Sequence, residues 1–200
     1  MDHKYAICVS GAAVTKCCND QAFEKTKELG KEIVRQGGIV ITGATTGVPL
    51  WAAQGAKEEN GYSIGMSPAN TKLEHVKKYK LPTKDFDIII YSGFGYSGRN
   101  LLLTRSSDGV IVSCGRLGTL NEFTIAFEDK KPIGVLVGTG GTADQIKNIV
   151  EKGNRGTGKI VYDTDPKKLV EKLIELIELE NKHAVPDNPY ENKKEGAQSG

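Results

Sequence analysis

Short apolar runs alternate with longer amphipathic stretches along the whole chain. Seven runs are rich in β-branched residues, and most lack the polar alternation of a half-exposed strand, which is typical of strands covered on both faces. These seven runs span residues 5–10, 38–42, 62–66, 86–91, 109–113, 132–137 and 159–163. Helical spacing of apolar residues occupies the intervals 20–36, 47–60, 98–107, 119–130, 142–152 and 166–180. Strands joined by helices in this way predict crossover connections and a parallel sheet.

The alternation predicts an α/β fold, namely a Rossmann-like, doubly wound and mainly parallel sheet of about seven strands flanked by helices. A chain of 200 residues is long enough for one buried core. We therefore expect a single nucleotide-binding domain over residues 1–180. Residues 181–200 are polar and rich in Pro, Gly, Asn and Lys, so we expect a flexible tail there.

Charge and hydropathy narrow the classes of partner. The formal net charge of +2 comes from interspersed acidic and basic residues, without the one-sided basic surface that holds nucleic acid, so nucleic acid is not an expected partner. No segment approaches the roughly eighteen consecutive apolar residues of a membrane span, and the N-terminus lacks the long apolar core of a signal peptide. These features predict a cytoplasmic protein with no membrane partner.

The cysteines and histidines form no recognisable ligand spacing. The four cysteines include an adjacent pair but no CxxC motif, so we expect reduced thiols, no disulfide framework and no metal site. They are Cys8, Cys17, Cys18 and Cys114. The three histidines are scattered in segments that we expect at the surface, and they are His3, His75 and His183. Cys114 follows a strand and precedes a helix, but no base that would activate its thiol is evident nearby.

Glycine-rich segments follow three of the predicted strands, at residues 10–15, 42–53 and 114–122. In a parallel sheet the carboxyl ends of the strands share one edge, where helix N-termini present unpaired N–H groups to anionic ligands. The segments also contain small hydroxyl residues that bind phosphate or cap helices, namely Ser10, Thr42, Thr45, Thr46 and Thr119. The GxGxxG fingerprint is absent after the first strand, which argues against a nicotinamide dehydrogenase. Trp51 can stack on a base or pack against the sheet.

The segment "GRNLLLTRSSDGVIVSCGRLGTLNE" resembles the signature of the Lonely Guy family, once labelled "possible lysine decarboxylases". That signature is an Arg on a helix, an Asp opening a strand, and then PGGxGTxxE. The matching residues are Arg99, Asp108, Gly115, Gly118, Thr119 and Glu122. The likeness covers about residues 5–180 and extends to a broader Rossmann-like superfamily with DNA-processing proteins and molybdenum-cofactor carriers.

The resemblance implies a nucleotide pocket and, in the Lonely Guy branch, hydrolysis of the N-glycosidic bond of a nucleoside 5′-monophosphate. The catalytic residues would be Arg99 and Glu122, because a carboxylate can stabilise the ribosyl cation and activate water. Phosphate or nucleotide binding is expected from the glycine segments, at Ser10, Gly11, Gly43, Thr46, Gly47, Gly115, Arg116, Gly118 and Thr119. Two simpler roles stay open: Glu122 as a capping-box partner of Thr119, and Arg99 as a solvated helix arginine.

The sequence departs from the family pattern beside the predicted phosphate loop. Cys114 and Arg116 replace its Pro and second Gly, the Met-His-x-Arg-Lys segment reads "YSGRN", and Asn121 stands where hydrolases often have a first Glu. Arg116 can add a guanidinium to the phosphate or fill the space that the phosphate needs. A second hypothesis is therefore a non-catalytic nucleotide or molybdenum-cofactor carrier or sensor.

The expected partner is a nucleoside monophosphate or a related phosphorylated small molecule, with no resident cofactor and no argument for pyridoxal phosphate. Relatives of this kind usually dimerise through helices that flank the pocket. Three consecutive leucines, Leu101, Leu102 and Leu103, expose more than one face of a monomeric surface helix would. We therefore expect a homodimer or higher homo-oligomer with some of these leucines in its interface.

Overall fold

The computed structural model describes residues 4–183, and these form one seven-stranded sheet in which every neighbouring pair of strands is parallel. The spatial order is β4-β3-β2-β1-β5-β6-β7. The strands are β1 (Tyr5–Gly11), β2 (Gly38–Thr42), β3 (Ser63–Ser67), β4 (Ile88–Tyr91), β5 (Gly109–Ser113), β6 (Ile133–Leu136) and β7 (Ile160–Asp163). The predicted Rossmann-like fold and its seven strands are confirmed, with boundaries that move by at most two residues.

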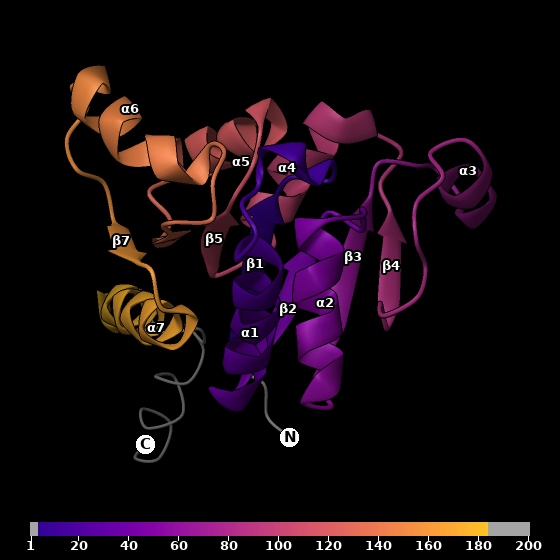
Figure 1. Cartoon of the computed structure of the whole chain (residues 1–200), viewed down its shortest axis with the longest axis horizontal. Coiled ribbons are helices and arrows are strands. Elements are labelled where there is room, and N and C mark those ends of the chain that lie inside the picture. The colour runs from indigo at the N-terminus through magenta and orange to yellow at the C-terminus, as the bar shows by residue number, and fades with distance from the viewer. Residues whose placement is uncertain (1–3, 184–200) are drawn as a thin grey trace, which may run out of the picture.

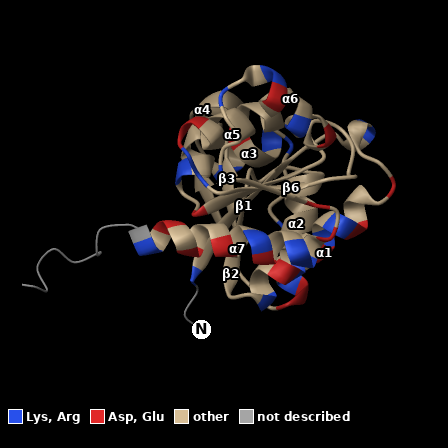
Figure 2. Cartoon of the chain, turned by 90° about the vertical axis from the view of Figure 1, so that its left-hand side faces the viewer, with Lys and Arg blue, Asp and Glu red and all other residues tan. Residues whose placement is uncertain are grey.

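Helices cover both faces of the sheet, as a doubly wound topology requires (Figures 1 and 2). They are α1 (Ala22–Arg35), α2 (Val48–Glu58), α3 (Lys72–Lys77), α4 (Gly95–Arg105), α5 (Leu117–Glu128), α6 (Ile146–Gly153) and α7 (Pro166–His183), with short 3₁₀ turns at Thr15–Cys17 and Ala143–Gln145. Helices α1, α2 and α7 pack on one face, and α4, α5 and α6 lie on the other. The predicted tail beyond His183 lies outside the described residues.

Two apolar cores lie on the two faces of the sheet. Alternate residues of β1 point to opposite faces, so Ile7 packs against Leu29 of α1 and Leu173 of α7, whereas Cys8 belongs to the core beneath Phe123 of α5. Burial on both faces explains why the strands read as continuous apolar runs. No helix among the described residues is long and apolar enough to cross a membrane.

Two local features differ from the sequence-based expectation. Helix α3 was not predicted, because its six residues are too few to show a helical period; Thr71 caps it by accepting a hydrogen bond from the Glu74 N–H. The prediction that His75 lies at the surface is wrong. Its ring is fully buried, with Nδ1 2.8 Å from Ser67 Oγ and Nε2 2.9 Å from Pro82 O. A histidine with both nitrogens paired is a satisfied core residue.

Candidate functional site

A cavity of about 280 Å³ opens at the carboxyl edge of the sheet, where β1 and β5 lie side by side and their connections diverge to opposite faces. Parallel α/β sheets bind ligands at such a switch point. Its walls come from the end of β1, the segments after β1 and β2, and the first two turns of α4 and α5. The lining residues are Gly11, Ala12, Ala13, Val14, Thr45, Tyr96, Arg99, Asn100, Arg116, Leu117, Gly118, Thr119 and Glu122.

A buried ion pair forms one wall of the cavity. Arg99 of α4 donates from Nη1 to Glu122 Oε1 of α5 at 2.8 Å, and the two residues are only 5% and 6% exposed. The second carboxylate oxygen accepts a short hydrogen bond from the Ser10 hydroxyl at the end of β1. The two simpler roles do not describe these residues, since Arg99 is not solvated and Glu122 bonds across the sheet edge.

Asn100 completes the surroundings of the Glu122 carboxylate. With its amide nitrogen facing the neighbouring acceptors, Asn100 donates to Glu122 Oε1 at 2.8 Å and to the Tyr96 carbonyl oxygen at 2.9 Å. The Nε atom of Arg99 is also buried, but it has no partner within the described residues. The ion pair with Glu122 therefore satisfies only part of the Arg99 guanidinium.

Burial raises the pKa of the Glu122 carboxyl above its ordinary value, because a charged carboxylate loses its hydration there. The Arg99 guanidinium and the Ser10 hydroxyl act in the opposite direction, since both stabilise the ionised form. Burial has the larger effect. The site therefore holds a carboxyl group that binds its proton more tightly than a surface glutamate, beside a fixed positive charge.

The anion turn, residues 114–119, carries the predicted phosphate loop from β5 into α5. Cys114 and Gly115 both have positive φ angles, 54° and 114°. Proline cannot adopt such a φ, so Cys114 in place of the family's Pro gives this turn a backbone that the Pro would forbid. Leu120 N–H donates to Arg116 O as the helix begins, which leaves the N–H groups of the preceding turn without helical partners. These groups and the exposed Arg116 place positive charge at the start of α5.

The predicted glycines of the second segment lie around the cavity wall instead of lining it. A Cβ on Gly43 would overlap the Arg99 guanidinium, and one on Gly47, whose φ is 69°, would overlap the Ala12 carbonyl oxygen. Thr46 donates its hydroxyl to Ala13 O at 3.0 Å. This segment therefore places Arg99 and fastens the turn after β1. Trp51 packs edge-on against Phe23, with ring centroids 5.3 Å apart, and does not line the cavity.

The structure gathers six predicted residues into the cavity lining, namely Gly11, Arg99, Arg116, Gly118, Thr119 and Glu122. Ser10 lies directly beneath it, and Gly115 packs against Thr119. Sequence reasoning missed Tyr96 and Asn100, although "YSGRN" surrounds the recognised arginine. Asp108, matched as part of the signature, lies at the opposite end of β5, where its Oδ2 and N–H both bond the backbone of Ala6.

The expectation of four reduced thiols is wrong for one pair. Cys18 and Cys114 form a disulfide with their Cα atoms 5.5 Å apart, while Cys8 and Cys17 are free. The bridge joins residues 96 positions apart, so no local spacing could reveal it. A bonded and buried Cys114 is also no free nucleophile.

Comparison with known proteins places this site among relatives of similar architecture. The molybdenum cofactor binding protein of Rippkaea orientalis is 28% identical with a TM-score of 0.69, and the match covers 89% of this chain and 98% of that one. The molybdenum cofactor carrier protein of Chlamydomonas reinhardtii is 27% identical with a TM-score of 0.70, over 88% of this chain and 99% of its own.

A third structure, the structural-genomics target TM1055, shares the fold with a TM-score of 0.71 at 24% identity, over 88% of this chain and 99% of that chain. The model of the SLOG cluster4 family matches residues 4–170, which include every residue of the cavity. The resemblance to the Lonely Guy proteins and their Rossmann-like superfamily is thereby confirmed, and the chain belongs to the SLOG cluster4 family.

Proposed function

We propose that this protein binds and carries a phosphorylated small molecule of the molybdenum-cofactor class. The observation that carries the proposal is the division of the cavity into two parts. Arg99 and Glu122 pair with one another, whereas Arg116 and the first turn of α5 present positive charge to the cavity. An anionic phosphate fits the second part, and the polar atoms around Asn100 and Tyr96 suit a ring with several donors and acceptors.

Two relatives support this choice, since a molybdenum-cofactor binding protein and a carrier protein match nearly their full lengths to this chain. The cavity of about 280 Å³ suits a ligand with one phosphate better than a dinucleotide. Cofactor transport needs binding and release only, so a carboxylate held by three neighbours is no obstacle to it.

The test is cofactor uptake in cells. The protein is purified from a host that makes the molybdenum cofactor and from a matched host in which its synthesis is blocked. Molybdenum is measured by mass spectrometry and the pterin by fluorescence after oxidation. We expect both signals from the first host only. Arg116→Gln should lower cofactor occupancy at least tenfold, whereas Arg155→Gln, at an exposed arginine away from the cavity, should not. Equal molybdenum from the two hosts contradicts the proposal.

A second candidate is phosphoribohydrolase activity on a nucleoside 5′-monophosphate. The observation that favours it is the position of Glu122 in the cavity wall beside Arg99, with burial raising the pKa of its carboxyl group, because such a group binds a proton more readily than a surface glutamate. In this mechanism Arg99 orients the carboxylate, which stabilises the ribosyl cation and activates the attacking water.

The substitution Glu122→Gln distinguishes the two candidates. Gln keeps the size of the side chain but can neither carry charge nor accept a proton, so a hydrolase should lose a factor of about 10²–10⁴ in turnover. A carrier should keep its affinity within severalfold. Release of free base from a panel of nucleoside monophosphates is measured together with ligand binding, and circular dichroism checks the fold. Equal turnover by both proteins would exclude Glu122 as the catalytic carboxylate.

A further inference from the structure

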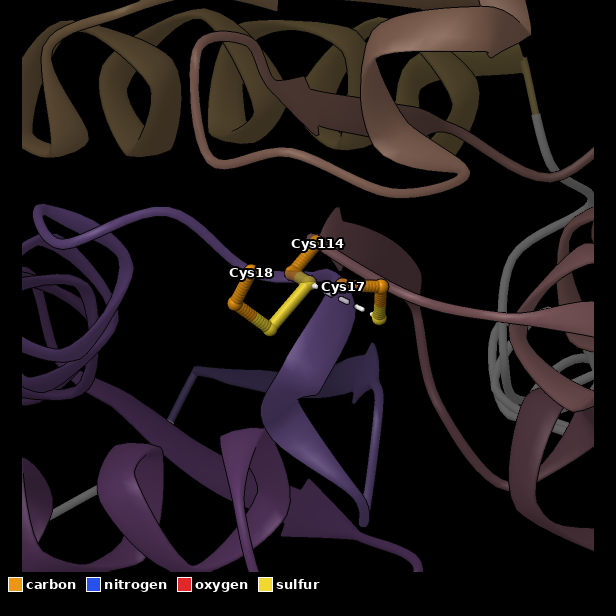
Figure 3. Close-up of side chains that lie close together, drawn as sticks. All are labelled: Cys17, Cys18 and Cys114. Carbon is orange, nitrogen blue, oxygen red and sulfur yellow. Dashed lines mark hydrogen bonds between the residues drawn. A yellow bond between two sulfur atoms is a disulfide. The ribbon is translucent and has the colours of Figure 1, made fainter.

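Three sulfur atoms from two distant parts of the chain meet beside the anion turn. Cys17 ends the short 3₁₀ turn after β1 and Cys18 follows it, while Cys114 directly follows β5 (Figure 3). We call these three residues the cysteine cluster. Their Sγ atoms all lie within 4.8 Å of one another. The function proposed above uses none of these sulfurs.

The disulfide uses only two of them. Cys17 keeps a free thiol, whose Sγ lies 3.6 Å from Cys114 Sγ and 3.4 Å from the Gly115 carbonyl oxygen. Cys114 is fully buried, while Cys17 and Cys18 are half-buried, so the cluster has one shielded side and one accessible side. A soluble dithiol reductant can supply the two electrons and two protons that turn the Cys18–Cys114 bond into two thiols, while the reductant becomes a disulfide. All three sulfurs are then available together.

Three sulfurs this close match the first shell of a soft metal ion. Around an ion with metal–sulfur bonds of about 2.3 Å, three thiolates lie about 4 Å apart. The Sγ atoms of Cys17 and Cys114 are already 3.6 Å apart, whereas those of Cys18 and Cys114 are bonded to one another and must separate to this distance once the disulfide is reduced. Among the described residues, no histidine or carboxylate belongs to the cysteine cluster. Soft thiolate ligands bind both Cu⁺ and Zn²⁺, but structural Zn²⁺ sites have four protein ligands. A three-sulfur group therefore favours Cu⁺.

We propose that reduction of the Cys18–Cys114 disulfide creates a binding site for one Cu⁺ ion, formed by the thiolates of Cys17, Cys18 and Cys114. Binding forms three Cu–S bonds and releases the protons of the three thiols. The ion and the disulfide exclude each other, because Cys18 and Cys114 supply sulfur to both. Cys114 is also the first residue of the anion turn, so the proposed Cu⁺ site adjoins the wall of the cavity.

The experiment titrates Cu⁺ into the full-length protein in competition with bicinchoninate, a coloured Cu⁺ chelator, under anaerobic conditions. One sample is reduced with a phosphine that is then removed, and the other keeps its disulfide. We expect the reduced protein to take one equivalent of Cu⁺ per chain, with at least tenfold higher affinity than the oxidised protein. Circular dichroism establishes that the reduced chain keeps its fold.

Matched variants locate the site. Cys17→Ser leaves both disulfide partners in place and removes one ligand, so it should weaken Cu⁺ binding at least tenfold. Cys8→Ala removes the buried thiol outside the cluster and should leave Cu⁺ binding unchanged. Equal affinity of the reduced wild type and Cys17→Ser would overturn the proposal. So would retention of Zn²⁺ but not Cu⁺ in a parallel titration, or loss of the native spectrum on reduction.

Discussion

Glu122 carries a carboxyl group in a place from which water is largely excluded, and its neighbours determine its charge. Burial favours the neutral acid, whereas the Arg99 guanidinium and the Ser10 hydroxyl favour the carboxylate. Because the folded state raises the pKa of Glu122, it binds this proton more tightly than the unfolded chain does. The contribution of Glu122 to stability is therefore greatest at low pH and falls as the pH rises from the ordinary carboxyl value through the raised pKa.

Arg99→Met should steepen this pH dependence. Without the guanidinium the pKa of Glu122 rises further, and the carboxylate is left buried and unpaired at neutral pH. We expect a loss of about 3–5 kcal/mol in the free energy of unfolding at neutral pH. The loss should shrink as the pH falls below the raised pKa, where a neutral Glu122 needs no counter-ion. Urea unfolding across this pH range measures the effect. Arg105→Met, which removes an exposed arginine paired with Asp129, serves as the control and should show a much smaller change. Parallel pH profiles for Arg99→Met and wild type would contradict this account.

Gly118→Val tests the anion turn without disturbing the fold. A Cβ at Gly118 meets no atom within 4 Å, and the residue lines the cavity, so the added side chain would project into free space where a phosphate is expected. Affinity for the bound cofactor or monophosphate should fall at least tenfold, which corresponds to about 1.4 kcal/mol. Calorimetry measures this affinity, and thermal unfolding should change little. Gly153→Val, at the equally open end of α6, provides the control. Undiminished affinity in folded Gly118→Val would place the phosphate elsewhere.

For individual residues, the sequence could identify Arg99 and Glu122 as candidates for the site but could not show how their side chains interact. Their types and spacing matched a known signature, whereas the hydrogen bond from Ser10 and the contact of Gly43 with the guanidinium depend on how three strands meet. The disulfide was missed for the same reason, since only the pairing of β1 with β5 brings Cys18 to Cys114.

Helix α4 faces the cavity on one side and solvent on the other. Its inner side supplies Arg99, Asn100 and the buried Leu103, while Leu101 and Leu102 are 37% and 38% exposed. Such a helix shows little amphipathic contrast, so its first turn, at Gly95, was predicted three residues late. The strands and the long helices could be predicted because burial on two faces, or on one stripe, leaves a clear period in the sequence.

The exposed side of α4 predicts self-association. Replacing Leu101 and Leu102 together with serine should shift a dimer to monomers at micromolar concentration, because two apolar contacts are lost from the interface. Light scattering at several concentrations measures the mass. Leu179→Ser is the control, because Leu179 of α7 is also an exposed leucine but lies on the other face of the sheet. This substitution should leave the mass unchanged. A wild-type monomer would remove the prediction.

For the whole molecule, the Cys18–Cys114 disulfide closes a long loop across the centre of the sheet. Because a long closed loop restricts the unfolded chain most, reduction should lower the free energy of unfolding by about 2–4 kcal/mol. Guanidinium unfolding with and without reductant measures the difference. Cys18→Ser should reproduce the reduced value without reductant and should not respond to it. An equal midpoint for the oxidised protein and Cys18→Ser would show that the bridge contributes nothing to stability.

The order of the strands also divides the molecule along a seam. Strands β1 to β4 come from the first half of the chain and β5 to β7 from the second. Within the described sheet the halves are joined only by the pairing of β1 with β5, while α1 packs against α7 and α4 against α5 across the same boundary. During synthesis, β1 is therefore an edge strand with unpaired backbone groups until β5 has been synthesised. The cavity draws its walls from both halves, as does the pair formed by Arg99 and Glu122. A ligand bound in the cavity would contact both halves, and its binding free energy would oppose their separation.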